Sequence, residues 1–321
     1  MKSFLIVYLS FALFLTAVQP ANGQQTQYGI TAESVIYLRS KPAMSAELTS
    51  QTLMGMPVKI LSFSDGWYQI VTPEGYTGYV DGDGVVPMNS AALHAWNVAP
   101  KVIVTDYFTI VRDNASKTAA VVADVVWGDL LLLKGDKKGY YQVQLPDGRT
   151  GYLHKSYAQH FDKWLASRNP TAENLIATAK KFLGFPYFWG GVSTKGVDCS
   201  GFMQACYFLN GVIIARDASQ QAAAGEAVDI SHGYDSLQRG DLLFFASQEN
   251  GKVNIFHVGM YIGDNRFIQA AGIVHISSLS PEAKDYDKFN AEHLYCARRF
   301  ITCIDKDKGI VSIAKHPWYR L

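Results

Sequence analysis

The stretch Val197-Asp198-Cys199-Ser200-Gly201-Phe202 organises the sequence, because it joins a glycine-rich loop (186–191) to an apolar segment with helical spacing (202–209). A cysteine at the start of a helix lies beside unpaired backbone N–H groups and the positive end of the helix dipole, and both lower the pKa of a thiol. The position therefore predicts Cys199 as a nucleophile. The alternative is an inert core cysteine, since free cysteines are often buried.

The composition is that of a globular protein with more than one domain. The chain has 321 residues, a net charge of +1 and 18% charged residues, so it lacks the basic surplus typical of proteins that bind nucleic acids or anionic membranes. Its 18 tyrosines and 17 phenylalanines are typical of small β domains. We expect a monomer with no nucleic-acid partner.

The N-terminus has the pattern of a secretory signal. Lys2 precedes an apolar run from Phe4 to Val18, and small residues follow up to Gly23. The run is shorter than the roughly 20 residues that span a bilayer, and no cysteine near Gly23 could carry a lipid. We expect residues 1–23 to be removed and the mature protein to be exported, periplasmic or secreted, without a membrane anchor.

An internal repeat follows the signal. Six residues recur 73 positions later, and the pairs are Arg39/Arg112, Gly55/Gly128, Trp67/Tyr140, Tyr68/Tyr141, Gly78/Gly151 and Tyr79/Tyr152. Such a constant offset is unlike chance similarity, and turn residues divide each copy into short strands. The pattern predicts two small all-β domains at residues 24–98 and 99–160, with a linker at 87–100 that contains a helical turn.

The third region, expected at residues 161–321, has an α+β layout. Helical spacing covers 175–183, the segment after Cys199 and 220–225, whereas apolar strand patterns cover 242–246, 258–262, 267–270 and 295–301. Whether the tail 302–321 packs on this region stays open.

The four cysteines give no metal or disulfide framework. Cys206 follows Cys199 by seven residues and is expected to pack inward, and whether Cys296 and Cys303 pair stays open. The sequence contains no CxxC and no His/Cys cluster with zinc spacing, so we expect neither a metal nor an organic cofactor.

A thiol nucleophile needs a base, and His257 is the best candidate. It opens the segment 257–269, which looks like two strands joined by a tight turn at Gly263. Centring the turn on Gly263 places His257 opposite Gln269, whose amide oxygen would accept the Nδ1–H and leave Nε2 for Cys199. His275 is a rival orienting residue, and an ordinary strand histidine is the alternative for His257.

Four ordered motifs resemble those of the NlpC/p60 family of bacterial cell-wall cysteine peptidases. They are Tyr187-x-Trp189-Gly190-Gly191, Val197–Phe202, Arg239–Phe245 and His257–Gly263. The resemblance implies a papain-like α+β catalytic domain preceded by two bacterial SH3-like barrels. It further implies Cys199 as nucleophile, His257 as base, Gln269 as the third polar residue where many members have a second histidine, and Tyr187 as a contributor to the oxyanion hole.

The sequence Arg216-Asp217-Ala218-Ser219 resembles members that bind a free N-terminal L-Ala and cut the bond between γ-D-Glu and a diamino acid. An ammonium group held by carboxylates gains charge-assisted hydrogen bonds that a blocked N-terminus cannot make. The substrate-contacting residues that this resemblance implies are Asp198, Ser200, Asp217, Ser219 and, from the first barrel, Tyr76 and Glu47.

The expected function is therefore hydrolysis of the γ-D-Glu–diamino acid bond (diaminopimelate or Lys) in peptidoglycan-derived peptides with a free N-terminal L-Ala, in cell-wall turnover or recycling. Two alternatives stay open. One is an endopeptidase that acts on intact peptidoglycan with the barrels as wall-binding modules. The other is a catalytically silent wall-binding protein.

Overall fold

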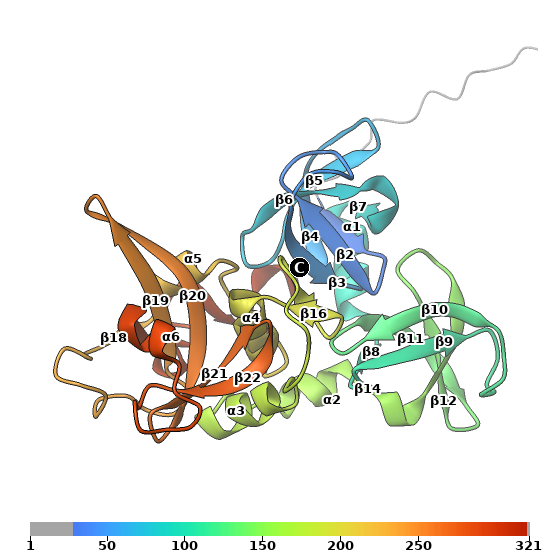
Figure 1. The fold of residues 1–321 in the computed structure, drawn as a ribbon. Coiled ribbons are helices and arrows are strands. Elements are labelled where there is room, and N and C mark those ends of the chain that lie inside the picture. Colours follow the sequence, from blue (N-terminus) through green and yellow to red (C-terminus); the bar gives the residue numbers. More distant parts are fainter. Residues whose placement is uncertain (1–27, 320–321) are drawn as a thin grey trace, which may run out of the picture.

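Two β units and one α+β unit follow one another along the chain (Figure 1). The computed structural model describes residues 28–319, so the expected signal peptide lies outside the described residues. We call residues 28–88 the first β unit, 101–160 the second β unit and 161–319 the α+β unit. Within residues 28–319, no helix is both long enough and apolar enough to cross a membrane.

The first β unit is a seven-stranded sheet with the order β3-β2-β6-β5-β4-β1-β7. Its strands are β1 (Tyr28–Thr31), β2 (Val35–Arg39), β3 (Leu48–Leu53), β4 (Pro57–Ser64), β5 (Trp67–Val71), β6 (Thr77–Asp81) and β7 (Val85–Met88). Alternating buried side chains of these strands, among them Leu38, Val58 and Ile70, form its core. The sequence pattern predicts strands at 35–38, 58–63, 67–71 and 78–80; these are confirmed as β2, β4, β5 and β6, and β1, β3 and β7 are additional.

The second β unit repeats this architecture, with the order β10-β9-β13-β12-β11-β8-β14. Its strands are β8 (Lys101–Val104), β9 (Phe108–Arg112), β10 (Val121–Val126), β11 (Leu130–Lys137), β12 (Tyr140–Gln144), β13 (Thr150–His154) and β14 (Ala158–His160). Each strand begins 73 residues after its counterpart. Arg39 donates to the Ala46 carbonyl at 2.8 Å, and Arg112 donates to the Ala119 carbonyl at 2.6 Å. The sequence repeat is thus a structural duplication.

The segment between the two β units is more than a linker. It forms α1 (Ser90–Val98), which Asn89 caps by accepting the backbone N–H of Ala92 at 2.9 Å. The helix buries Leu93 and Trp96 in a cluster with Ile30. The helical turn expected within 87–100 is thus confirmed as a nine-residue helix, and its apolar side chains pack against the first β unit.

The α+β unit is built on a six-stranded antiparallel sheet with the order β18-β23-β19-β20-β21-β22. Its strands are β18 (Glu226–Val228), β19 (Leu242–Glu249), β20 (Lys252–Gly263), β21 (Arg266–Ala271), β22 (Ile273–Ser278) and β23 (Leu294–Arg299). Two short pairs accompany it: β15 (Val192–Ser193) with β16 (Gly196–Val197), and β17 (Val212–Ile214) with β24 (Ile310–Ser312). The helices are α2 (Phe161–Ala166), α3 (Ala172–Lys180), α4 (Cys199–Phe208), α5 (Ala218–Ala222) and α6 (Lys288–His293). The expected α+β class is confirmed.

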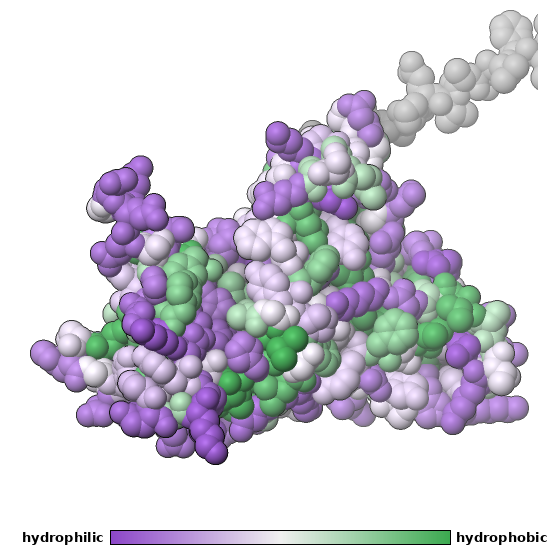
Figure 2. Space-filling model, viewed as in Figure 1, coloured by the Kyte–Doolittle hydropathy of each residue, from purple (hydrophilic) through white to green (hydrophobic). Residues whose placement is uncertain are grey.

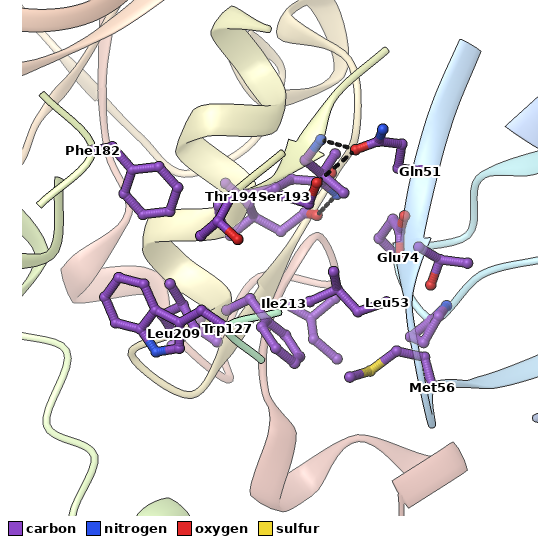
Figure 3. A pocket seen from close by; sticks show the side chains of 18 of the residues that line it. Gln51, Leu53, Met56, Glu74, Trp127, Phe182, Ser193, Thr194, Leu209 and Ile213 are labelled. Atoms are coloured by element: carbon purple, nitrogen blue, oxygen red, sulfur yellow. Dashed lines mark hydrogen bonds between the residues drawn. The ribbon is translucent and has the colours of Figure 1, made fainter. Parts of the chain in front are cut away.

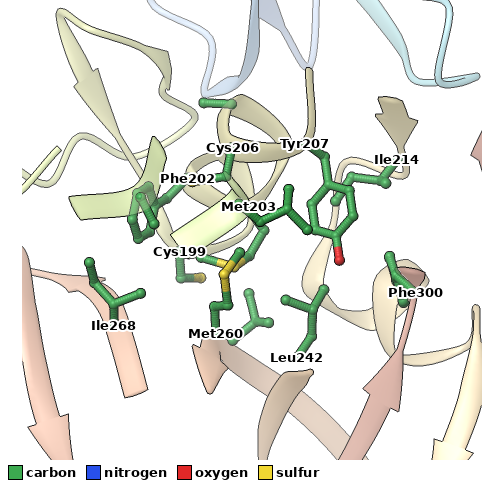
Figure 4. Packing of buried hydrophobic residues seen from close by; sticks show 14 of the residues in the cluster. Cys199, Phe202, Met203, Cys206, Tyr207, Ile214, Leu242, Met260, Ile268 and Phe300 are labelled. Atoms are coloured by element: carbon green, nitrogen blue, oxygen red, sulfur yellow. The ribbon is translucent and has the colours of Figure 1, made fainter. Parts of the chain in front are cut away.

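Helix α4 forms the centre of the main hydrophobic core. Phe202, Met203 and Cys206 are completely buried, in one cluster with Met260 of β20 and Ile268 of β21 (Figure 4). Cys206 therefore packs inward as expected. All four cysteines are unpaired, which answers the question left open for Cys296 and Cys303.

The C-terminal tail ties the α+β unit to the first β unit. Strand β24 pairs with β17. After β24, the His316 Nε2 lies 3.0 Å from the carbonyl oxygen of Pro73 in the first β unit. Asn97 of α1 donates to the carbonyl of Trp318 at 2.8 Å, and the Trp318 ring packs edge-on against Tyr28. The tail thus fixes the position of the first β unit relative to α4.

An apolar cavity lies beside α4, where both β units meet the α+β unit (Figure 3). Leu53, Met56, Trp127 and Ile213 line it, and at its edge Gln51 of β3 accepts hydrogen bonds from the Val192 N–H and the Ser193 hydroxyl at 3.0 and 3.1 Å. Cys199 and His257 are not among its lining residues, so this cavity is separate from the site described next.

Candidate active site

The glycine-rich loop and Asp198 together determine where α4 begins. Asp198 caps the helix, since its Oδ1 accepts the Gly201 N–H at 2.7 Å and its Oδ2 accepts the Gly190 N–H at 2.9 Å. A side chain at position 201 would place its Cβ 2.0 Å from the carbonyl oxygen of Gly191, so only glycine fits there. This arrangement brings Cys199 to the first turn of the helix.

The Cys199 thiol is buried at the junction of α4 and β20, with 8% of the residue exposed. Burial and the nearby Asp198 carboxylate raise its pKa to about 11, although backbone hydrogen bonds from Val258 and Ser200 act in the opposite direction. The expectation that the helix start lowers this pKa was therefore wrong, because desolvation of the thiolate outweighs the backbone N–H groups.

His257 and Gln269 meet as expected, but in a different register. Gly259, not His257, is directly opposite Gln269, because the turn consists of Asp264 and Asn265, between the paired Gly263 and Arg266, rather than being centred on Gly263. A shift of two residues keeps both side chains on the same face of the sheet, and the His257 Nε2 lies 2.6 Å from the Gln269 Oε1. The Nε2 atom is thus engaged, which leaves Nδ1, rather than the expected Nε2, to act as the base. The pKa of His257 is lowered overall, because burial disfavours the imidazolium. The hydrogen bond to Gln269 acts in the opposite direction and offsets only part of this effect.

His275 is next to Gln269 on the neighbouring strand β22 and makes no hydrogen bond to His257. It is the cross-strand partner of Gln269 on β22, its Nε2 is 3.4 Å from the Gln269 Nε2, and its Nδ1 is 2.9 Å from the carbonyl of Ile273. Gln269, not His275, is therefore the residue that contacts the imidazole.

Tyr187 lies near the Cys199 thiol, on the loop that precedes α4. Its backbone N–H donates to the carbonyl of Gly272 at 2.8 Å, which fixes the loop against the end of β21. Burial, followed by the charge of Cys199, raises the pKa of Tyr187 to about 12. The phenol therefore stays protonated at neutral pH and can donate a hydrogen bond.

Asp198 and Ser200 are engaged with Arg216 inside the protein. The Arg216 Nη2 is 2.5 Å from the Asp198 Oδ2, and its Nη1 donates to the Ser200 hydroxyl at 2.9 Å. All three residues are at least 94% buried. The positions expected to contact substrate thus also hold α4 in place.

The remaining expected residues lie where the first β unit faces the α+β unit, at α5 and at the glycine-rich loop. Tyr76 is close to Asp217, since burial and then the Asp217 charge raise the pKa of the Tyr76 phenol. Glu47 accepts a hydrogen bond from the exposed Trp189 indole at 3.1 Å. Asp217 is half-buried at the start of α5, and Ser219 is exposed on its first turn. Two chain segments more than 100 residues apart therefore meet here.

Several residues around the site were not singled out from the sequence. Arg216 stands next to Asp217 in the motif, but nothing in the sequence pairs it with Asp198. Asp287 and Asn290 contact Gln269 from α6, and Ser50 contacts Arg216 from the first β unit. Polar residues far apart in sequence carry no local signal of such contacts.

Comparisons with known proteins agree with this architecture. Residues 184–293 match the NlpC/P60 family, and residues 34–86 match the bacterial SH3 domain. The gamma-D-glutamyl-L-lysine dipeptidyl-peptidase of Bacillus cereus is 34% identical over 232 residues, which cover 70% of this chain and 67% of that protein. The dipeptidyl-peptidase 6 of Lysinibacillus sphaericus is 31% identical over 259 residues, 76% of this chain and 89% of that protein.

A solved structure extends the likeness to the arrangement of the units. The crystal structure of a NlpC/P60 family protein from Bacillus cereus ATCC 10987 superposes with a TM-score of 0.71 at 27% identity, covering 85% of this chain and 99% of that one. These matches show that the chain belongs to the NlpC/P60 family of cysteine peptidases.

Proposed function

We propose that this enzyme hydrolyses the bond between γ-D-Glu and a diamino acid in cell-wall peptides that begin with a free L-Ala. The observation that carries this proposal is that Tyr76 of the first β unit lies near Asp217 at the start of α5, so that the Asp217 charge raises the pKa of the Tyr76 phenol. We expect these polar and acidic groups to suit a short peptide end with a free amine better than a continuous strand. The printed names of the two relatives, a gamma-D-glutamyl-L-lysine dipeptidyl-peptidase and a dipeptidyl-peptidase 6, support the same substrate class.

Recognition of the ammonium group rests on Asp217. Burial raises the pKa of Asp217, while the Arg216 guanidinium acts in the opposite direction. Arg216 is already paired with Asp198, so Asp217 gains most from an additional cation. A substrate ammonium would supply that cation, whereas an acetylated N-terminus would leave a partly buried carboxylate without one.

Burial disfavours the charged form of both Cys199 and His257, so we propose that the resting pair is neutral and that catalysis begins with a proton transfer. The His257 Nδ1 takes the proton of the Cys199 thiol as the sulfur attacks the γ-carbonyl carbon of D-Glu. The Tyr187 hydroxyl and the backbone N–H of Cys199 hold the resulting oxyanion. His257 then protonates the leaving amine of the diamino acid, and a water molecule, deprotonated by His257, hydrolyses the thioester and regenerates the thiol.

The test compares L-Ala-γ-D-Glu-diaminopimelate, its Lys counterpart and the N-acetylated form of each. We expect kcat/KM to fall about 100-fold on acetylation, because one charge-assisted contact is replaced by an unpaired carboxylate. Equal rates for free and acetylated peptides would contradict the free-amine preference. Fragments released from intact sacculi as fast as from free peptides would favour the endopeptidase alternative.

We also propose that the protein acts outside the cytoplasm after residues 1–23 are removed. The apolar run and small residues before Gly23 support this proposal. N-terminal sequencing of the protein from the periplasm or medium should begin at Gln24, whereas an intact Met1 there would contradict removal of the signal.

A further inference from the structure

Gln269 is held by a polar network formed by Ser277 of the neighbouring strand β22 and by Asp287 and Asn290 at the start of α6. Its Nε2 donates to the Asp287 Oδ2 at 2.9 Å and to the Ser277 hydroxyl at 2.8 Å. Asp287 caps α6, because its Oδ1 accepts the Asn290 N–H at 3.0 Å, and its Oδ2 also accepts from the Asn290 Nδ2 at 2.7 Å. The Gln269 side chain is completely buried, so this network alone determines which way its amide points.

The chemistry of Asp287 decides the orientation of that amide. An ionised carboxylate accepts hydrogen bonds and cannot donate them. Burial would raise the pKa of Asp287, but hydrogen bonds from Asn290 and Gln269 hold it below the ordinary value, so the group is ionised at neutral pH. The NH₂ of Gln269 must therefore face Asp287, and its carbonyl oxygen must face His257.

The orientation of Gln269 in turn decides the tautomer of His257. A carbonyl oxygen 2.6 Å from the His257 Nε2 requires a hydrogen on that nitrogen. The neutral imidazole then has its lone pair on Nδ1, the atom that is to accept the Cys199 proton. The Asn290 Nδ2, 3.2 Å from the Gln269 Oε1, reinforces the same polarity.

We infer that Asp287 is a positioning residue, which fixes the Gln269 amide and thereby holds His257 as the Nε2–H tautomer with Nδ1 as the base. This inference rests on the proposed function. The other ionisable groups around His257 are Asp198 before α4, His275 on β22 and Cys199 itself, and Phe245 of β19 covers the ring. Asp198 and Asp287 are the two carboxylates near His257, and of these two Asp287 is the one that is hydrogen-bonded to Gln269.

Asp287→Asn tests this assignment with little change in shape. Asparagine is as good a helix cap as aspartate, so α6 is retained. Its amide can present NH₂ to Gln269, which lets the Gln269 amide turn over and favours the inactive Nδ1–H tautomer. We expect kcat to fall about 10- to 100-fold with KM within twofold, because the base is mispositioned while the substrate contacts remain. The matched control is Asp285→Asn, which removes an exposed pair with Arg266 and should leave kcat unchanged.

A reversal of polarity gives a second, independent test. Gln269→Glu places two carboxylates against each other and should reduce kcat at least as strongly as Asp287→Asn. Adding Asp287→Asn supplies an NH₂ donor to the new carboxylate, whose other oxygen can accept from His257. The double variant should therefore recover about tenfold over Gln269→Glu alone, a non-additivity typical of one hydrogen-bonded network.

The tautomer itself is read by ¹⁵N NMR of histidine-labelled protein in the Cys199→Ala background, which needs no activity. We expect Nε2–H for His257 in that parent and a population of Nδ1–H after Asp287→Asn. An unchanged tautomer, kcat within twofold of the Asp285→Asn control or a double variant without recovery would overturn the inference. Failure of the proposed function would show differently, as full peptide hydrolysis by Cys199→Ala.

Discussion

Arg216 and Asp198 form an ion pair that is buried directly behind the start of α4, with the Arg216 Nη2 2.5 Å from the Asp198 Oδ2. The Arg216 Nε also donates to the Ser50 hydroxyl of β3 at 2.9 Å. The first β unit is thus linked through a single guanidinium to the residue that caps the nucleophile helix. This link makes the position of Cys199 depend on a domain whose sequence lies more than 100 residues upstream.

Removing one partner of this pair should be costly. Asp198→Asn leaves the Arg216 guanidinium, which is 2% exposed, without its countercharge and should lower the free energy of unfolding by about 3–5 kcal/mol. Asp147→Asn, which disrupts the exposed pair with Arg149, should change it by less than about 1 kcal/mol. Urea unfolding of both variants provides the measurement. An equal change in the free energy of unfolding for both variants would show that the buried pair stabilises the protein no more than the exposed one.

Cys199→Ala should abolish hydrolysis while the fold persists. Loss of the nucleophile is expected to reduce kcat by at least about 1,000-fold, since no other group can form the acyl intermediate. Cys303→Ala, which removes another unpaired thiol, should retain wild-type rates. Rates are measured on L-Ala-γ-D-Glu-diaminopimelate, and circular dichroism confirms folding. Comparable loss in both variants would argue against a specific role for Cys199.

The pH dependence should be that of a neutral cysteine–histidine pair. Burial lowers the pKa of His257 below 6.5, so the base loses its proton at a more acidic pH than an ordinary imidazole does. We therefore expect kcat/KM to persist to a correspondingly lower pH. Burial raises the pKa of Cys199 to about 11, so alkylation by iodoacetamide should accelerate as the pH rises toward that value. The apparent pKa values from such measurements describe Cys199 and His257 together rather than either residue alone. An alkylation rate that is already maximal near pH 5 would instead indicate a thiolate–imidazolium pair.

Tyr76→Phe should weaken binding of the peptide's amino end. Removing the hydroxyl beside Asp217 is expected to raise KM for the free-amine peptide about tenfold and to leave kcat nearly unchanged, because the reacting carbonyl is elsewhere. Tyr68→Phe, a tyrosine of the same β unit that packs on Phe63, is the matched control. Steady-state kinetics on both variants check this. A fall in kcat without a change in KM would place Tyr76 in a different role.

Much of the architecture could be predicted from sequence because it depends on local patterns. The offset of 73 residues predicted the duplicated strands, and the Cys199 motif predicted a helix start. Strands β1 and β3 were missed, since their burial comes from neighbours distant in the chain. The turn was misplaced at Gly263 because the two residues that adopt the left-handed turn conformation are Asp264 and Asn265, and a one-residue bulge beside them shifts the register again.

The sequence by itself determined the candidate nucleophile, base and third polar residue, because each stands in a motif whose local backbone conformation follows from its own residues. Tertiary structure alone decided that Asp198 pairs with Arg216, that burial raises the pKa of the Cys199 thiol and that Asp287 orients Gln269. The physical reason is that desolvation and hydrogen-bond polarity depend on which distant segments enclose a group. Those segments here come from β3, β22 and α6, and only folding brings them to the start of α4.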